Sequence, residues 1–137
     1  MREIKFRAWI ERYQKYMPVA MIYFEPILGK IDYIEVVATG GDWAKFYPEE
    51  VILEQYTGLK DKNGNMIFEG DIVKINGWWN AAGPAGYNEN QTVVKFNDEF
   101  CGFNPMCDYD CDCGVYHPAD ECEVIGNIHD NPELLHA

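Results

Sequence analysis

Apolar and polar residues alternate over much of the chain, and this period of two predicts β-strands. In residues 3–10 every second side chain from Ile4 onward is apolar, which would place one side of a strand on a core. Residues 16–24 and 31–39 are rich in β-branched and aromatic side chains, whereas 42–50 is expected to be a loop or one short helical turn. No segment has the length and period of a long helix.

The strongest turn signal lies in residues 55–75, where the dipeptide Asn63-Gly64 separates two extended segments. Both residue types tolerate the positive φ angles that a type I′ turn requires, so this segment predicts a tight β-hairpin. The acidic corner Glu69-Gly70-Asp71 follows. We expect this corner to be the entry to a strand rather than an acid–base pair.

Later strands are predicted at residues 91–96, 100–103 and 122–128, and Gly126 indicates a bulge or bend in the last of them. Short strands that are separated by turn residues about every 8 to 12 positions are typical of a small barrel or a sandwich. The sequence alone does not choose between these two architectures.

Residues 76–89 have the Gly-rich and Asn-rich composition of a loop, and they carry the adjacent Trp78 and Trp79. The two rings could form a partner surface, because large exposed aromatic side chains are enriched at binding sites. We favour the other possibility, a lid on the core, because burial of aromatic surface is strongly favourable.

The negative charge is concentrated in the second half of the chain. Residues 1–75 hold 10 Lys or Arg and 12 Asp or Glu, net −2, whereas residues 76–137 hold Lys95 and 11 acidic residues, net −10. Proteins bind a phosphate backbone largely through Lys and Arg, which argues against direct binding of DNA or RNA by this half. Basic residues near the N-terminus form a small basic face or, as we favour, the solvated side of a strand. They are Arg2, Lys5, Arg7, Arg12 and Lys15.

No apolar run reaches the roughly 18 residues of a membrane-spanning helix, and the first residues alternate in polarity instead of resembling a signal peptide. We therefore expect a cytoplasmic protein without membrane association. The five cysteines are an odd number, clustered between Cys101 and Cys122. Without a secretion signal they are expected to be reduced thiols or metal ligands rather than a disulfide framework.

Four blocks of sequence, at residues 6–9, 55–64, 69–73 and 123–135, resemble the YopX protein family of phages and prophages. Their sequences are FRAW, QYTGLKDKNG, EGDIV and EVIGNIHDNPELL. The resemblance implies a mostly β fold with an SH3-like barrel in the C-terminal part, in a small protein of phage or prophage origin that self-associates in a host bacterial cell. It implies no catalytic residue for this chain.

On this basis we expect an N-terminal β-rich segment at residues 1–54 and an SH3-like barrel at residues 55–137. The barrel is expected to carry loop insertions at 76–89 and 104–121. The first of these loops and the cysteine-rich segment 107–122 are where the chain departs from the shared blocks. Any function that is particular to this protein is therefore expected there.

The segment 107–122, CDYDCDCGVYHPADEC, holds the strongest candidate metal ligands. Thiolate and imidazole groups can bind zinc or iron, but the paired C-x2-C spacing of structural zinc sites is missing. We favour a strand in which alternate side chains, among them Tyr109 and Val115, face a core, and we assign no metal site. The candidate ligands are Cys107, Cys111, Cys113, His117 and Cys122.

Three aspartates of this segment, Asp108, Asp110 and Asp112, copy positions 1, 3 and 5 of an EF-hand calcium loop. The rest of the loop does not fit, because Gly114 falls at position 7 instead of 6 and Ala119 stands where a bidentate glutamate is needed. We therefore expect no calcium site.

Acidic residues are abundant, but no spacing singles out a pair for acid–base catalysis. The candidates are Glu69, Asp71, Asp120 and Glu121. The three histidines are expected at the surface. They are His117, His129 and His136. No phosphate-binding loop, dinucleotide fingerprint or nucleophile elbow is present, so we expect a non-enzymatic protein without catalytic or cofactor-binding residues.

These observations predict an accessory protein that works by contact with proteins, either a host protein or further copies of itself, and that forms a homo-oligomer. The acidic second half is the expected binding surface, because attraction to a basic host protein would speed association and weaken with salt. The alternative is a metal-binding module or a metal-dependent enzyme that uses the Cys, His and Asp side chains of residues 107–122.

Overall fold

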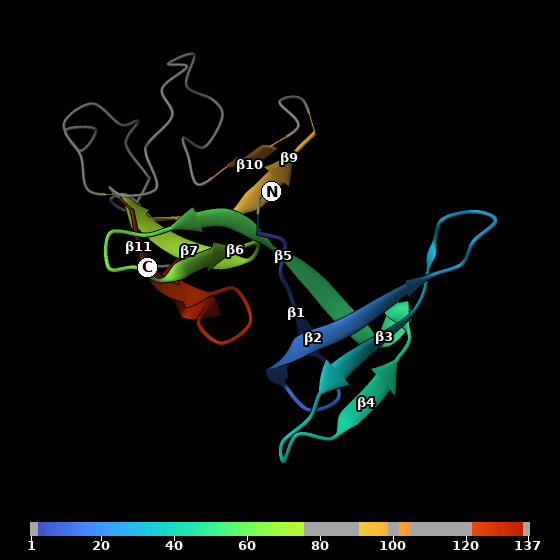
Figure 1. The fold of residues 1–137 in the computed structure, drawn as a ribbon. Helices are drawn as coiled ribbons and strands as arrows, with labels where there is room; N and C mark the ends of the chain where they lie inside the picture. Colours follow the sequence, from blue (N-terminus) through green and yellow to red (C-terminus); the bar gives the residue numbers. More distant parts are fainter. Residues whose placement is uncertain (1–2, 76–90, 99–101, 105–121, 136–137) are drawn as a thin grey trace. The chain divides into compact units, whose positions relative to one another are not determined.

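The computed structural model describes residues 3–75, 91–98, 102–104 and 122–135 (Figure 1). In these ranges the regular structure consists of β-strands in antiparallel sheets and short 3-10 helices, so the predicted mostly β fold is confirmed. The chain divides into two compact units, Met1–Tyr56 and Thr57–Ala137, and the division falls inside one long strand.

The first unit is built on one antiparallel sheet with the strand order β4-β3-β2-β1-β5. Its strands are β1 (Phe6–Ile10), β2 (Lys15–Phe24), β3 (Ile31–Val37), β4 (Trp43–Phe46) and β5 (Val51–Lys60), and the helix η1 (Pro48–Glu50) precedes β5. Because β1 lies between β2 and β5, the first and the last strand of this unit pair with each other.

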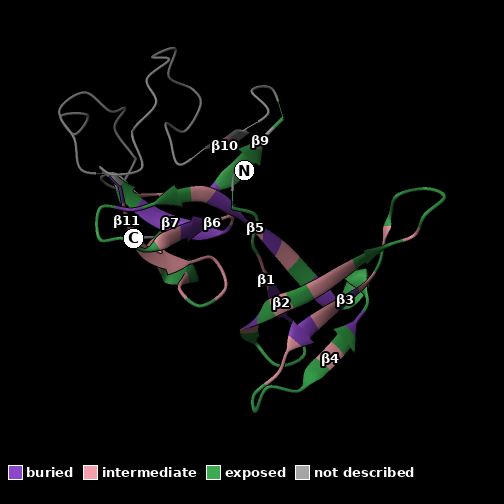
Figure 2. Ribbon diagram, in the orientation of Figure 1, coloured by how far each residue is buried: buried purple, intermediate pink, exposed green. Residues whose placement is uncertain are grey.

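The alternation of apolar residues in β1 explains the core of the first unit. Ala8 is fully buried, lies opposite Met17 of β2 and opposite Leu53 of β5, and joins them in one hydrophobic cluster. Ile34 and Val36 of β3 complete this cluster from alternate positions of their own strand. Buried and exposed positions alternate along the strands in Figure 2 as the period of two predicts.

The alternation does not hold at every position of the first predicted strand. Ile4 is exposed, whereas Trp9, on the side predicted to face solvent, is buried. The Trp9 ring lies opposite Tyr16 of β2, and the two rings meet edge to face with centroids 5.0 Å apart. Aromatic packing of this kind gives β1 a second side of buried side chains.

Strand β4 corrects the prediction for residues 42–50. The segment contains a strand at Trp43–Phe46 as well as the short helix η1, and the strand pairs with β3, placing Phe46 opposite Ile34. The prediction of a short helical turn is confirmed at η1 only. The four residues of β4 carry too little periodic signal to distinguish a strand from a loop.

The second unit contains the end of β5, several short strands and the helix η4 (Pro132–Leu135). Its further strands are β6 (Met66–Phe68), β7 (Asp71–Ile75), β8 (Gln91–Val93), β9 (Lys95–Asn97), β10 (Gly102–Asn104) and β11 (Cys122–Asn127). Strand β6 is the neighbour of β5, while β11, β7 and β8 form a second sheet and β9 pairs with β10. Its hydrophobic cluster consists of Ile67, Val73, Val94 and Cys122.

The β5–β6 hairpin is present, but its turn differs from the predicted type I′ turn. Gly64 has a φ of +83°, whereas Asn63 does not have a positive φ. The N–H of Gly64 donates to the carbonyl of Asp61 at 3.0 Å, and the N–H of Asp61 donates to the carbonyl of Asn65 at 2.8 Å. This pattern is a three-residue loop in which a type I turn is followed by a left-handed glycine.

The bulge predicted at Gly126 is confirmed. The pairing of β11 with β7 shifts between Val124 and Gly126, so two consecutive ladder positions of β7 face residues that are two apart in β11. Asn131 packs against the α-carbon of Gly126, and a β-carbon at residue 126 would lie only 2.6 Å from its Oδ1. A side chain therefore does not fit at this position without a shift of Asn131.

None of the sheets formed by the described residues closes into a barrel. The predicted SH3-like barrel spans residues 55–137, and much of this range, including the predicted insertions, lies outside the described residues. The barrel and the boundary after residue 54 stay predictions.

Candidate functional site

The outer part of the β2–β3 hairpin extends beyond the strands beside it. Strand β1 pairs with β2 only from Lys15 to Pro18, and β4 pairs with β3 only from Ile34 to Val37. Residues 19–33 therefore extend past β1, and residues 23–33 extend past β4 as well; we call residues 19–33 the hairpin arm (Figure 1).

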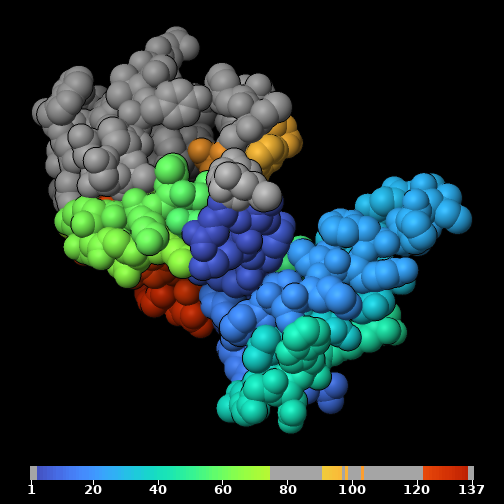
Figure 3. Space-filling model, viewed as in Figure 1, coloured from blue at the N-terminus to red at the C-terminus, as the bar shows by residue number. Residues whose placement is uncertain are grey.

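The tip of the hairpin arm presents two aliphatic side chains to solvent. Ile27 is 88% exposed and Leu28 is 69% exposed. The carboxylate of Glu25 accepts hydrogen bonds from the backbone N–H groups of Ile27, at 2.7 Å, and of Leu28, at 2.8 Å, and Gly29 closes the turn with a φ of +68°. The tip stands clear of the rest of its sheet in the space-filling view (Figure 3). It is thus an ordered apolar projection, not a loose loop.

One side of the first unit's sheet carries a row of aromatic rings with a lysine among them. Tyr23 and Tyr33 lie opposite each other on β2 and β3 and stack with centroids 5.0 Å apart. The Nζ atom of Lys45 lies 4.0 Å from the centroid of Tyr33 and 5.6 Å from that of Tyr47. Trp43, on the same strand as Lys45, is 61% exposed. Exposed aromatic groups on a sheet are typical of protein-binding surfaces.

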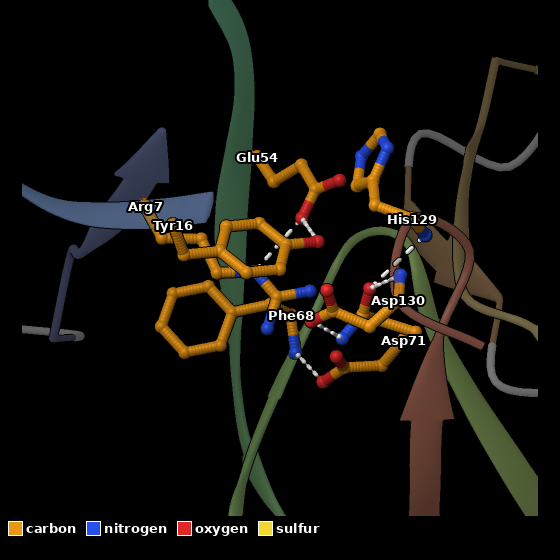
Figure 4. A network of polar contacts seen from close by, with 8 residues as sticks. Arg7, Tyr16, Glu54, Phe68, Asp71, His129 and Asp130 are labelled. Carbon is orange, nitrogen blue, oxygen red and sulfur yellow. Dashed lines mark hydrogen bonds and ion pairs between the residues drawn. The ribbon is translucent and has the colours of Figure 1, made fainter. Parts of the chain in front are cut away.

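The buried carboxylate of Glu54 belongs to a polar network within the first unit (Figure 4). Its Oε2 accepts a hydrogen bond from Nε of Arg7 at 2.7 Å and another from the hydroxyl of Tyr16 at 2.9 Å. The Arg7 guanidinium also lies 4.2 Å from the centroid of the Tyr16 ring. Because Arg7 and Tyr16 stand on the two strands of one hairpin, this network joins β1, β2 and β5. The carboxylate is satisfied by protein groups, which indicates a structural role.

Asp61 fastens the β5–β6 turn to β11 in the second unit. Its carboxylate accepts hydrogen bonds from the backbone N–H groups of Asn63, at 2.9 Å, Asn65, at 2.8 Å, and Val124, at 2.9 Å. Burial by itself raises the pKa of Asp61, but these hydrogen bonds outweigh it and hold the pKa below its ordinary value. The N–H of Lys62 donates to the carbonyl of Cys122, which ties the same two segments together.

The acidic corner Glu69-Gly70-Asp71 is the entry to strand β7, as predicted. The Oδ2 atom of Asp71 accepts a hydrogen bond from the N–H of Phe68 at 2.8 Å (Figure 4). Backbone hydrogen bonds join Gly70 and Asp71 to Val94, and the carbonyl of Gly70 accepts one from Ile128. These contacts place Asp71 in the framework of the unit, where it is 3% exposed.

Asn127 organises the chain after β11. Its Oδ1 accepts hydrogen bonds from the backbone N–H groups of His129, at 3.0 Å, and Asp130, at 2.9 Å. His129 is half-buried in this turn, although it was predicted to be a surface residue. The side chain of Asn127 and the backbone of His129 therefore have a structural role in this turn.

Most of the metal candidates lie outside the described residues. These are Cys107, Cys111, Cys113 and His117, together with the aspartates Asp108, Asp110 and Asp112. Cys122 is described, and it is fully buried in the hydrophobic cluster of the second unit. Trp78, Trp79, Asp120, Glu121 and His136 also lie outside the described residues.

Within the described part of the chain, no group of three or more His, Cys, Asp or Glu side chains could hold a metal ion. No helix in that part is long and apolar enough to cross a membrane. The segment Asp61 to Asn65 resembles a ligand loop in sequence, but the oxygens of Asp61 accept N–H donors. The prediction that this segment is a turn is therefore confirmed.

The described residues define a small antiparallel β protein whose buried acids hold its strands together and whose exposed apolar groups lie mainly in the first unit. The chain belongs to the YopX protein family, whose model matches residues 5–136, so the predicted family is confirmed. Among solved structures, the chain is similar to the crystal structure of protein EF1440 from Enterococcus faecalis. The TM-score is 0.59 and the sequence identity is 26%, over 98% of this chain and 99% of that chain. No curated protein matches the chain significantly.

Two features of the first unit were not predicted from the sequence. The exposure of Ile27 and Leu28 depends on how far the hairpin arm extends beyond its neighbours, which no local pattern shows. The network around Glu54 had a usable signal, because a single acid stands in the apolar run VILEQY, as Arg7 does in FRAW. An acid and a base in two buried strands predict an ion pair when those strands are neighbours.

Proposed function

We propose that the protein is a non-enzymatic interaction protein of phage or prophage origin that acts in a bacterial host by binding proteins, both a host protein and further copies of itself. One observation carries the proposal: of the twelve large hydrophobic side chains that are exposed among the described residues, nine belong to the first unit. A surface with this many exposed aromatic and aliphatic groups is typical of a protein that binds other proteins.

The buried carboxylates support a role without catalysis. Glu54, Asp61 and Asp71 accept hydrogen bonds from an arginine, a tyrosine or backbone N–H groups. Catalytic acids and bases are usually set beside a reactive neighbour in a cleft instead. These three acids stabilise strands and turns, which is a sufficient reason for their burial.

The proposed partner in the host is a basic protein, and the second half of the chain is the proposed surface for it. Residues 57–137 carry 14 acidic residues and 4 Lys or Arg, net −10, whereas residues 1–56 carry 9 and 7, net −2. Such a charge attracts a basic partner over a distance and raises the association rate, and dissolved salt screens the attraction.

Affinity capture from bacterial host cells, with mass spectrometry of the bound proteins, tests this proposal. A variant with Asp108→Asn, Asp110→Asn and Asp112→Asn loses three charges of the acidic half. The matched control carries Glu11→Gln, Asp42→Asn and Glu49→Gln, three exposed acids of the first unit. We expect basic partners that are depleted with the first variant and retained with the control. Equal recovery with all three proteins would contradict the proposal.

The competing function is a metal-binding module or a metal-dependent enzyme built on residues 107–122. Its support is the sequence itself, because Cys107, Cys111, Cys113 and His117 are ligands that zinc or iron accepts. Elemental analysis of protein purified without chelators or an affinity tag decides between the two functions. A metal content of one ion per chain that disappears with Cys111→Ser would favour this function over the interaction protein.

A further inference from the structure

The hairpin arm has an open strand edge. Strand β2 pairs with β3 on one side over residues 19–24, but none of the described strands pairs with it there on the other side. Unpaired N–H and C=O groups along such an edge are a template for pairing with another chain. Residues 23–33 have no third strand beside them among the described residues, and a two-stranded hairpin is only marginally stable in water without a further strand or a covering element.

This edge lacks the charges that normally protect strand edges. Residues 19–24 read VAMIYF, without a charge, a proline or a glycine. The opposite edge of the sheet, strand β4, has Lys45 in its middle, and a lysine is a common protection against pairing with other chains. The pairing of β2 with β3 shifts register before Met21 and after Tyr23. Between these two shifts, residues 21–23 pair in regular order with residues 35–33. The open edge therefore keeps a regular, uncharged stretch.

We propose that two copies of the protein associate through this edge, with β2 of one copy antiparallel to β2 of its partner across a twofold axis. The inference rests on the proposed function and names the surface of its self-association. An uncharged strand that pairs with a second copy of itself brings no like charges opposite each other. A twofold axis perpendicular to the sheet keeps Met21 and Tyr23 on the same side in both copies, so the interface is isologous.

The small contact and the net charge of each copy indicate a weak dimer. Residues 19–24 span about 20 Å and their regular part, Met21 to Tyr23, about 10 Å, which gives a contact at the small end of specific interfaces even with the apolar tip beside it. Each copy carries a net charge of −12, so the copies repel each other at low ionic strength. We therefore expect a weak, concentration-dependent dimer that salt strengthens. Binding of a basic partner by the acidic half has the opposite salt dependence.

Sedimentation velocity of the full chain, over a concentration series at low and moderate salt, tests the proposal. The wild type is expected to shift from monomer to dimer as its concentration rises. Met21→Lys and Ala20→Lys each place a charge on the open edge and are expected to weaken the dimer at least tenfold. The matched control is Leu59→Lys, which puts the same charge on an exposed apolar position of β5 in the second unit.

Several results would overturn the proposal: a wild type that stays monomeric at every concentration, or edge variants that dimerise as well as Leu59→Lys. Circular dichroism checks the fold of each variant. The side chain of Ala20 is exposed, so Ala20→Lys decides the question if Met21→Lys does not fold. Hydrogen exchange gives a second readout, because the amides of residues 19–24 should gain protection with concentration. Protection gained at β4 instead would also overturn the proposal.

The sedimentation experiment and the affinity capture test different proposals, so one proposal can be contradicted while the other stands. A wild type that dimerises through another surface contradicts the edge assignment and leaves self-association in place. A failed capture of basic proteins contradicts the proposed host partner, while the concentration dependence of sedimentation is unaffected by it.

Discussion

Gly64 has the backbone angle on which the β5–β6 turn depends. Its φ is +83°, and no atom lies within 4 Å of the place that a β-carbon would occupy, so a side chain there would be strained by the backbone angle and not by a clash. Gly64→Val is expected to lower the free energy of unfolding by about 1 to 3 kcal/mol, measured by urea denaturation. The control Asn63→Ala should cost clearly less, because Asn63 does not have a positive φ. Equal losses in the two variants would contradict the special role of the Gly64 backbone angle.

Asp61 should make stability depend on pH in the acid range. Its pKa in the folded protein lies below the unfolded value of about 3.9, so folding favours the ionised form. The stabilisation is present above the unfolded pKa and is lost as the pH falls through the folded pKa. We expect Asp61→Asn to flatten the decline of the unfolding free energy below about pH 4, measured by urea denaturation at several pH values. A similar flattening in Asp32→Asn, an exposed aspartate of β3, would contradict this assignment.

Gly126 should tolerate no side chain while Asn131 keeps its position. A β-carbon would lie 2.6 Å from Oδ1 and 2.8 Å from Cγ of Asn131, so Gly126→Ala is expected to destabilise the protein by about 1 to 3 kcal/mol. In the double variant Gly126→Ala/Asn131→Ala the clash is removed, and the loss should be less than the sum of the two single losses. Thermal unfolding of the four proteins measures this coupling, and additive losses would show that the clash is not the cause.

At the scale of elements, the ion pair of Arg7 and Glu54 joins three strands of the first unit. The side chain of Glu54 is 5% exposed and that of Arg7 is 18% exposed. Glu54→Ala leaves Arg7 without its carboxylate and is expected to cost about 3 kcal/mol, at the low end for a buried pair because Arg7 reaches solvent. Glu54→Gln keeps an acceptor for Tyr16 and should cost less. Urea denaturation measures both, and a neutral effect of Glu54→Ala would contradict the role of this network.

The sequence predicted the elements that have a clear period or a strong turn residue. Ala8 and Ile10 followed the alternation of β1, and Gly126 marked the bulge of β11. The predicted type of the β5–β6 turn was wrong. The carboxylate of Asp61, which lies outside the dipeptide, accepts hydrogen bonds from the N–H groups of Asn63 and Asn65. A local preference of Asn63 for a positive φ is weaker than these charge-assisted hydrogen bonds.

The exposed tip of the hairpin arm was harder to predict than the strands. Isolated apolar residues such as Ile27 and Leu28, between Pro26 and Gly29, look the same in sequence whether they are buried or exposed. Their exposure follows from the lengths of β1 and β4, which end before the hairpin arm does. Exposure of this kind is a property of the sheet and not of the segment.

At the scale of the whole molecule, the charge divides as the two compact units do. The first unit has a nearly balanced charge and, among the described residues, most of the exposed large hydrophobic side chains, while the second carries most of the negative charge. The proposed function assigns a different kind of attraction to each unit: apolar contact for self-association to the first and electrostatic attraction of a basic partner to the second. The two kinds respond to salt in opposite directions.

The rate at which a captured basic partner associates with the protein tests the central claim most directly. Stopped-flow measurements at low and at physiological ionic strength should show a rate that falls steeply with salt, by at least tenfold. The rate should also fall in the variant that lacks the charges of Asp108, Asp110 and Asp112, but not in the Glu11, Asp42 and Glu49 control. A rate that is independent of salt and equal for the three proteins would contradict the account.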